Sequence, residues 1–148
     1  MRPTVPPPAL PRRLCGTDTT SGLLIGPDPR HLRDARRWAA QTTRSRPGLA
    51  EPVTLALSEL ATNAQRHSAS GLPGGAVRIE IERTRHRIDL RVTDHGPRPG
   101  HRATFPTVPA PDPLRPSGNG LRLLDALCSY WDWTQGPGGQ ITVRAVFT

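Results

Sequence analysis

Val77-Arg-Ile-Glu-Ile-Glu82 and Ile88-Asp-Leu-Arg-Val92 are the stretches that decide the fold. In both, apolar residues alternate with charged ones, and this period of two is typical of a strand with one buried and one wet face. The short polar segment between them predicts a hairpin. One-sided burial occurs in antiparallel sheets that are covered on a single face. The hairpin therefore predicts an antiparallel sheet with helices packed on one side.

The segments around this hairpin fit the same arrangement. Apolar residues recur at helical spacing in three segments, and three further runs are short enough to be strands. The predicted helices span residues 30–44, 51–68 and 121–129, and the predicted additional strands span 22–25, at an edge of the sheet, 130–134 and 140–147. Pro47-Gly48 is expected to end the first helix. Together they predict an α+β fold, a two-layer α/β sandwich with a mostly antiparallel sheet.

The length and composition favour one domain. A chain of 148 residues can form one substantial core but hardly two. Residues 1–20 are rich in Pro and Arg and contain little to bury, which predicts a disordered tail before a domain over residues 21–148. The N-terminus has no apolar leader, and no stretch reaches the length of a membrane span. We expect a soluble, cytoplasmic protein that does not contact a membrane.

The net charge of +8 at first suggests a nucleic-acid partner. All 20 basic residues are Arg, however, and the absence of Lys is typical of the codon bias of a GC-rich genome. Basic residues also alternate with acidic ones in the predicted strands. Nucleic-acid binding is therefore the least favoured function. Two distant cysteines, Cys15 and Cys128, provide neither a disulfide framework nor a zinc site.

A polar stripe runs along the second predicted helix. Glu59, Asn63 and His67 are four residues apart and share one helix face. Asn is a poor helix former, so its central position needs a reason. Its amide oxygen is a hard ligand suited to Mg²⁺, and a nearby Glu can act as a general base. Taken alone, the stripe is still better interpreted as a solvated helix face.

Two glycine-containing segments follow this helix along the chain. Asp94, at the end of a predicted strand and two residues before Gly96, places a carboxylate at the rim of the sheet, where it can accept a hydrogen bond from an exocyclic amine. Gly118-Asn-Gly120-Leu121 opens the third predicted helix, where backbone N–H groups are available to an anion. In isolation each segment is more often an ordinary turn or hinge.

The order and spacing of these segments resemble the ATP-binding domain of the histidine-kinase-like (GHKL, Bergerat-fold) ATPases. The match covers about residues 22–147 and has four parts, which are an N box over residues 59–68, a G1 box over 94–96, an ATP lid over about 97–117 and a G2 box over 118–121. Within this family the chain is most similar to the single-domain anti-sigma-factor serine/threonine kinases. The local similarities are Leu57-Ser-Glu-Leu-Ala-Thr-Asn-Ala-Gln-Arg-His67 and Gly120-Leu-Arg-Leu-Leu-Asp-Ala-Leu127.

The resemblance implies a role for each residue that matches a family motif. On the helix, Asn63 would bind a Mg²⁺ ion that bridges the phosphates, and Glu59 would be the general base or would position it. Arg66 and His67 would contact phosphate. In the loops, further nucleotide contacts are implied for Asp94 (the adenine amine), Gly96 (the pocket floor), Gly118 and Gly120 (access for the triphosphate) and Leu121 (the end of the G2 box). ATP and Mg²⁺ are the implied cofactors.

The resemblance also implies a function and partners. The protein would phosphorylate a serine on a STAS-type anti-anti-sigma protein, release ADP, and bind a sigma factor by partner switching. No direct contact with nucleic acid is implied, and a homodimer is compatible with the resemblance. The alternative is a non-catalytic module of the same fold that responds to nucleotide. The chain departs from the family pattern in two places. Arg98 stands where the G1 box has its second Gly, and the lid has no recognisable motif beyond its Pro content. An Arg there is expected either to crowd the nucleotide or to reach a phosphate.

Overall fold

The computed structural model describes residues 9–101, 106 and 120–148. The strands are Arg12–Leu14 (β1), Thr20–Ile25 (β2), Val77–Arg83 (β3), Ile88–Thr93 (β4), Tyr130–Gln135 (β5) and Ile141–Phe147 (β6). The α-helices are His31–Thr42 (α1), Pro47–His67 (α2) and Gly120–Leu127 (α3), and two short 3₁₀ helices span Ala69–Gly71 (η1) and Pro137–Gly139 (η2).

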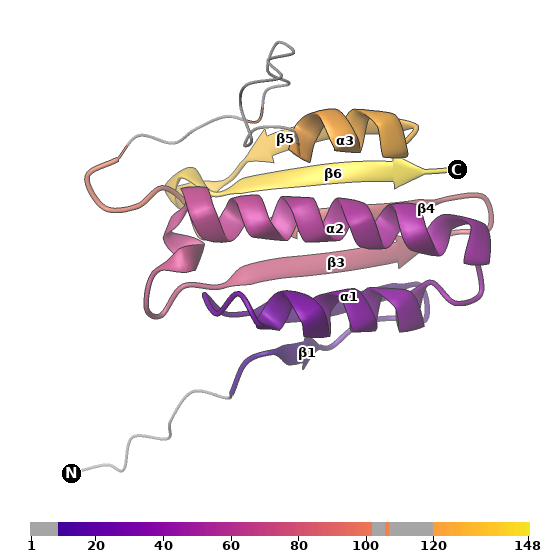
Figure 1. Ribbon diagram of the computed structural model, residues 1–148, viewed down its shortest axis with the longest axis horizontal. Coiled ribbons are helices and arrows are strands. Elements are labelled where there is room, and N and C mark those ends of the chain that lie inside the picture. The colour runs from indigo at the N-terminus through magenta and orange to yellow at the C-terminus, as the bar shows by residue number, and fades with distance from the viewer. Residues whose placement is uncertain (1–8, 102–105, 107–119) are drawn as a thin grey trace.

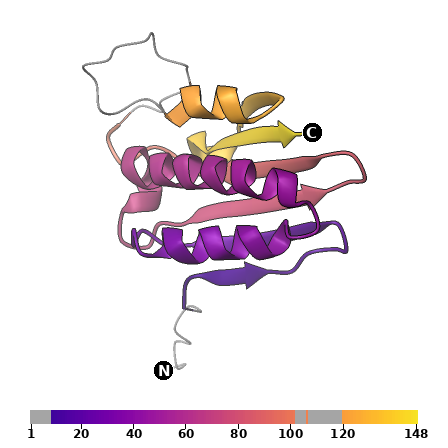
Figure 2. The ribbon, with the colours of Figure 1, turned by 45° about the vertical axis from the view of Figure 1, so that its right-hand side comes forward.

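The six strands form one sheet in the order β1-β2-β3-β4-β6-β5, and every neighbouring pair is antiparallel. The predicted hairpin forms β3 and β4, with Ile79 opposite Val92 and Ile81 opposite Leu90. All three α-helices cover the same face of the sheet (Figures 1 and 2). This two-layer α+β architecture confirms the predicted fold class.

The prediction that residues 1–20 form a disordered tail is wrong for β1, and residues 1–8 lie outside the described part of the chain. Strand β1 pairs with β2 from Arg12 opposite Leu24 to Leu14 opposite Gly22. The prediction that residues 22–25 form an edge strand is therefore also wrong, because β2 lies between β1 and β3. An edge strand pairs through backbone hydrogen bonds and does not require apolar side chains. The composition of residues 12–14 therefore did not reveal β1. The Thr17 hydroxyl orders the connecting turn by accepting the backbone N–H of Thr20 at 3.1 Å.

The boundary between the first two helices also differs from the prediction. Pro47 does not end the first helix but begins α2, where its missing N–H costs no helical hydrogen bond. Helix α1 has already ended at Thr42. The next residue, Thr43, closes it, because both its backbone N–H and its hydroxyl donate to the Ala39 carbonyl, at 3.0 and 2.7 Å.

The core lies between the sheet and the helices. It consists mainly of Leu, Ile, Val and Ala side chains, with Trp38 and Phe147 as its buried aromatic residues. Alternate residues of β3, β4 and β6 point into it, as the period of two predicted. Cys128 packs partly against the core, and burial raises the pKa of its thiol.

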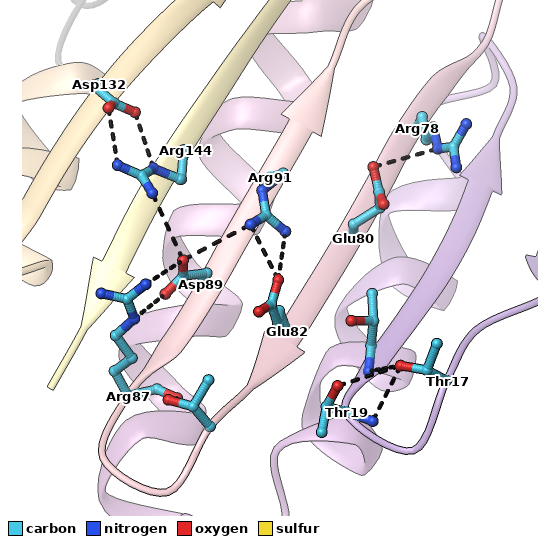
Figure 3. Close-up of polar contacts among 12 residues, drawn as sticks. Thr17, Thr19, Arg78, Glu80, Glu82, Arg87, Asp89, Arg91, Asp132 and Arg144 are labelled. Atoms are coloured by element: carbon cyan, nitrogen blue, oxygen red, sulfur yellow. Dashed lines mark hydrogen bonds and ion pairs between the residues drawn. The ribbon is translucent and has the colours of Figure 1, made fainter.

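The opposite face of the sheet carries a network of ion pairs that the sequence pattern did not predict (Figure 3). Asp89 on β4 is only 2% exposed, and three arginines surround its carboxylate. Arg87 Nε lies 3.0 Å from one carboxylate oxygen of Asp89, and Arg91 and Arg144 each lie 3.9 Å from the other. A buried carboxylate is tolerated when it is paired in this way.

A matched pair of leucines in α2 tests the assignment of the core. Leu57 is fully buried, whereas Leu55 is 41% exposed on the same helix. Leu57→Ala should lower the free energy of unfolding by about 3 kcal/mol because it leaves a cavity, while Leu55→Ala should change it by about 0.5 kcal/mol or less. Urea denaturation measures both values. Equal losses for the two variants would contradict this packing of α2.

Candidate functional site

The polar stripe lies on the C-terminal half of α2. Glu59 and Asn63 are half-buried, and Arg66 and His67 are exposed on the last turn. Within the described residues, none of these four side chains is engaged in a hydrogen bond or an ion pair. The structure thus places the four predicted residues on one helix and leaves their polar groups available to a ligand. Their individual roles stay predictions.

Asp94 directly follows β4 and is held by the backbone around it. Its Oδ1 atom accepts the N–H groups of Gly96, at 2.8 Å, and Ile141, at 3.1 Å. The Asp94 N–H in turn donates to the Ile141 carbonyl at 3.0 Å. In the described part of the chain, Oδ2 accepts no hydrogen bond. One carboxylate oxygen therefore fixes the orientation of the side chain, while the other is available to a hydrogen-bond donor of a ligand.

The segment after Asp94 is tied to the C-terminal end of α2. The Ala69 N–H donates to the Gly96 carbonyl at 2.8 Å, and the His95 N–H donates to the Ser70 hydroxyl at 2.8 Å. Ala69 and Ser70 belong to η1, which follows α2 almost at once. These bonds bring the two predicted halves of the site, on α2 and at the end of β4, to the same end of the molecule (Figure 1).

Gly96 has a conformation and a contact that exclude a side chain. Its φ angle is +88°, in a region that favours glycine. A Cβ atom at this position would lie 2.8 Å from the carbonyl oxygen of Gly138, in η2. The glycine therefore allows the loop after β4 to lie directly against the connection between β5 and β6.

Arg98 neither crowds the stripe on α2 nor extends toward solvent. Its Nε donates to the Ser68 carbonyl at 3.1 Å, and its Nη2 donates to the carbonyls of Arg66 and Gln65 at 3.0 and 3.4 Å. These are carbonyls at the end of α2, where a cation offsets the negative end of the helix dipole. The residue that departs from the family pattern is thus a cap for the helix that carries the predicted phosphate contacts.

Gln65 is a positioning residue that the sequence did not reveal. It is 8% exposed, and its amide donates to the carbonyls of Gly26 and Asp28 at 3.0 and 3.2 Å, which fixes the loop between β2 and α1 against α2. In that loop, the Arg30 guanidinium and then the Arg30 backbone N–H hold the pKa of Asp28 at about 2. A buried Gln with partners on a distant loop has no sequence signature.

The remaining predicted residues are only partly described. Gly118 and most of the predicted lid, residues 102–105 and 107–117, lie outside the described residues. Gly120 is the first residue of α3, and Leu121 packs partly against the core. Helix α3 lies beside α2, with its N-terminus toward the end of the molecule that carries Asp94 (Figure 1).

The donor groups at this end fit Mg²⁺ only when they are combined with a phosphate ligand. The described residues contain no group of three or more His, Cys, Asp or Glu side chains that could hold a metal alone. Asn63 offers a half-buried amide without a partner among the described residues. Because Mg²⁺ keeps several waters and is often held by few protein ligands together with substrate phosphates, this donor set is compatible with a metal that arrives with a nucleotide.

Replacing Arg98 tests its capping role. Arg98→Ala should lower the free energy of unfolding by about 1 kcal/mol, because three carbonyl contacts at a helix end are lost. Arg98→Lys should recover part of this loss. Arg85→Ala, in the exposed turn between β3 and β4, is the matched control and should have little effect. If urea denaturation gives the same free energy of unfolding for the Arg98→Ala and Arg85→Ala variants, the Arg98 cap does not stabilise the fold.

Two glycines with similar φ angles separate backbone strain from a steric clash. Gly74 has a φ of +80° and open space around it, whereas Gly96 has both a positive φ and the Gly138 carbonyl at its Cβ position. Gly96→Ala should therefore be less stable than Gly74→Ala by about 1 kcal/mol or more in thermal or urea denaturation. The opposite order would show that the loop after β4 does not pack against η2.

A comparison with protein-family models gives a match over most of the chain. A family model described as the histidine kinase-like ATPase domain matches residues 25–146. A search of curated proteins found no match. None of the helices in the described part of the chain has the length and apolar character needed to cross a membrane.

Proposed function

Because this chain belongs to the histidine kinase-like ATPase domain family, in which the fold binds ATP, we propose that it is an anti-sigma-factor serine/threonine kinase. The observation that carries the proposal is the pairing of two sets of groups at one end of the molecule. Asp94 presents a carboxylate oxygen at the end of β4, and the stripe from Glu59 to His67 presents an amide, a carboxylate and two basic side chains on α2.

The orientation of Asp94 supports recognition of adenine. Its Oδ1 is occupied by two backbone N–H groups, so Oδ2 accepts the exocyclic amine of the base. A guanine base carries a carbonyl oxygen at the same place, and two acceptors would then face each other. A site built around such a hydrogen bond rejects a base that lacks the donor. We therefore infer a preference for ATP over GTP.

The α2 stripe supports a role at the phosphates and in phosphoryl transfer. Arg66 and His67 would bind phosphate oxygens, and Asn63 would hold a Mg²⁺ ion, whose positive charge would neutralise the phosphates. Glu59 accepts the proton of a partner serine hydroxyl as that oxygen bonds to the γ-phosphorus and the bond to the ADP oxygen breaks. Positioning and charge neutralisation provide most of the catalysis in reactions of this type.

The proposed acceptor is a serine of a STAS-type anti-anti-sigma protein, and the unphosphorylated acceptor competes with a sigma factor for the kinase. The similarity of residues 57–67 and 120–127 to single-domain kinases of this kind supports this step. A non-catalytic module that responds to nucleotide is the alternative within the same fold.

Nucleotide binding is tested with Asp94→Asn and Asn63→Ala. In Asp94→Asn the carbonyl oxygen keeps the bonds to Gly96 and Ile141, so the loop stays in place, but an NH₂ group now faces the adenine amine. Calorimetric titration should show ATP affinity falling by at least about tenfold, and the preference for ATP over GTP should be lost. Asn63→Ala should weaken MgATP binding more than binding of ATP without metal. Wild-type protein that binds no ATP would overturn the proposal.

Catalysis is tested separately with Glu59→Gln. This variant should bind MgATP as the wild type does but transfer phosphate to a STAS-type protein at least about 100-fold more slowly, because the general base is lost. Transfer of ³²P from labelled ATP measures the rate. If the wild type binds ATP but phosphorylates no STAS-type protein encoded near its gene, the non-catalytic module replaces the kinase. Salt-sensitive binding to mixed DNA that does not depend on nucleotide would instead favour a nucleic-acid binder.

A further inference from the structure

A pocket lies at the end of the helical layer opposite Asn63 and Asp94. It has a volume of about 550 Å³ and opens between the β1–β2 hairpin and the C-terminal end of α1. Helices α1 and α2 run in opposite directions (Figure 1), and Gln65 near the end of α2 contacts the loop that precedes α1. The C-terminal end of α1 is therefore far from Asn63 and Asp94. The volume is within the range of small-molecule sites, about 300–1,000 Å³.

The groups around this pocket are rich in hydrogen-bond donors. Arg13 of β1 and Arg44, just after α1, provide two guanidinium groups. Gln41 accepts a hydrogen bond from Arg13 Nη2 at 3.3 Å, which leaves its NH₂ group to donate. Threonine and serine hydroxyls complete the polar lining, and none of the described residues that line the pocket is acidic. Such a set favours a ligand that carries negative charge and accepts hydrogen bonds.

Trp38 adds one more hydrogen-bond donor to the pocket lining. It lines the pocket and is 6% exposed. Its indole N–H has no hydrogen-bond partner within the described residues. The indole nitrogen is not fully buried and is therefore accessible from outside the protein. Because this nitrogen is accessible, its N–H can donate a hydrogen bond to an acceptor bound in the pocket.

We propose that this pocket binds a small organic or inorganic oxyanion, with carboxylate or phosphate oxygens between Arg13 and Arg44 and within reach of the Trp38 N–H. The site is distinct from the nucleotide site and does not depend on the function proposed for that site. The chain's own first eight residues contain no Asp or Glu, so they do not offer the complementary charge.

Titration of the full-length protein with citrate and with inorganic phosphate, at ionic strength matched with NaCl, tests the proposal. Calorimetry should detect saturable binding of at least one of the two anions by about 10 mM, a concentration that fills even a millimolar site. The anion that binds identifies carboxylate or phosphate as the preferred group. Arg13→Gln and Arg44→Gln should each weaken binding by about tenfold or more. Trp38→Phe should also weaken it, because the ring stays and the N–H is lost.

Two control variants locate the binding. Arg12→Gln changes the neighbouring residue of the same strand, which does not line the pocket, and should leave anion affinity unchanged. Asn63→Ala should also leave it unchanged, because the anion is not in the nucleotide site. The proposal is overturned if neither anion saturates the wild type. Binding that survives both Arg13→Gln and Arg44→Gln, or that is lost in Asn63→Ala, would also overturn it.

Discussion

The attachment of the loop after β4 to the end of α2 is the constraint on which the site depends. The bonds from Ala69 to Gly96 and from His95 to Ser70, together with the Arg98 cap, join two segments that are about thirty residues apart in sequence. Without them, α2 would still pack on the sheet through its apolar face. The distance between the polar residues on the helix and the Asp94 carboxylate, which we propose bind phosphate and adenine, would no longer be set.

Arg98, which replaces the second glycine of the family motif, has a structural role at the end of α2. A second glycine in the G1 box would leave the loop free to approach the nucleotide. The arginine instead extends to the carbonyls at the end of α2 and offsets the helix dipole there. The loop thus has an arginine attachment to the helix in place of a glycine. This attachment leaves the side chains of Asp94 and Asn63 available for the nucleotide binding that we propose.

The parts of this molecule that could be predicted from sequence have local, periodic patterns. The alternation in β3 and β4 predicted their buried faces, and the spacing of Glu59, Asn63 and His67 predicted one polar stripe. The features that could not be predicted depend on partners distant in sequence. Gln65 bonds to carbonyls of a loop almost forty residues earlier, and Arg98 bonds to carbonyls of α2. Any side chain with an N–H or O–H donor can bond to a backbone carbonyl, so no residue pattern marks these contacts. Strand β1 was missed because its edge pairing uses backbone groups rather than apolar side chains.

A crystal structure with Mg²⁺ and a non-hydrolysable ATP analogue would show whether Asp94 and α2 bind the same nucleotide, as we propose. We expect the adenine amine within hydrogen-bond distance of Asp94 Oδ2 and the phosphates beside Asn63 and Arg66. The Arg98 guanidinium should remain on the carbonyls at the end of α2. An analogue bound elsewhere, or an Arg98 side chain that has left the helix end to contact the phosphates, would contradict the proposal.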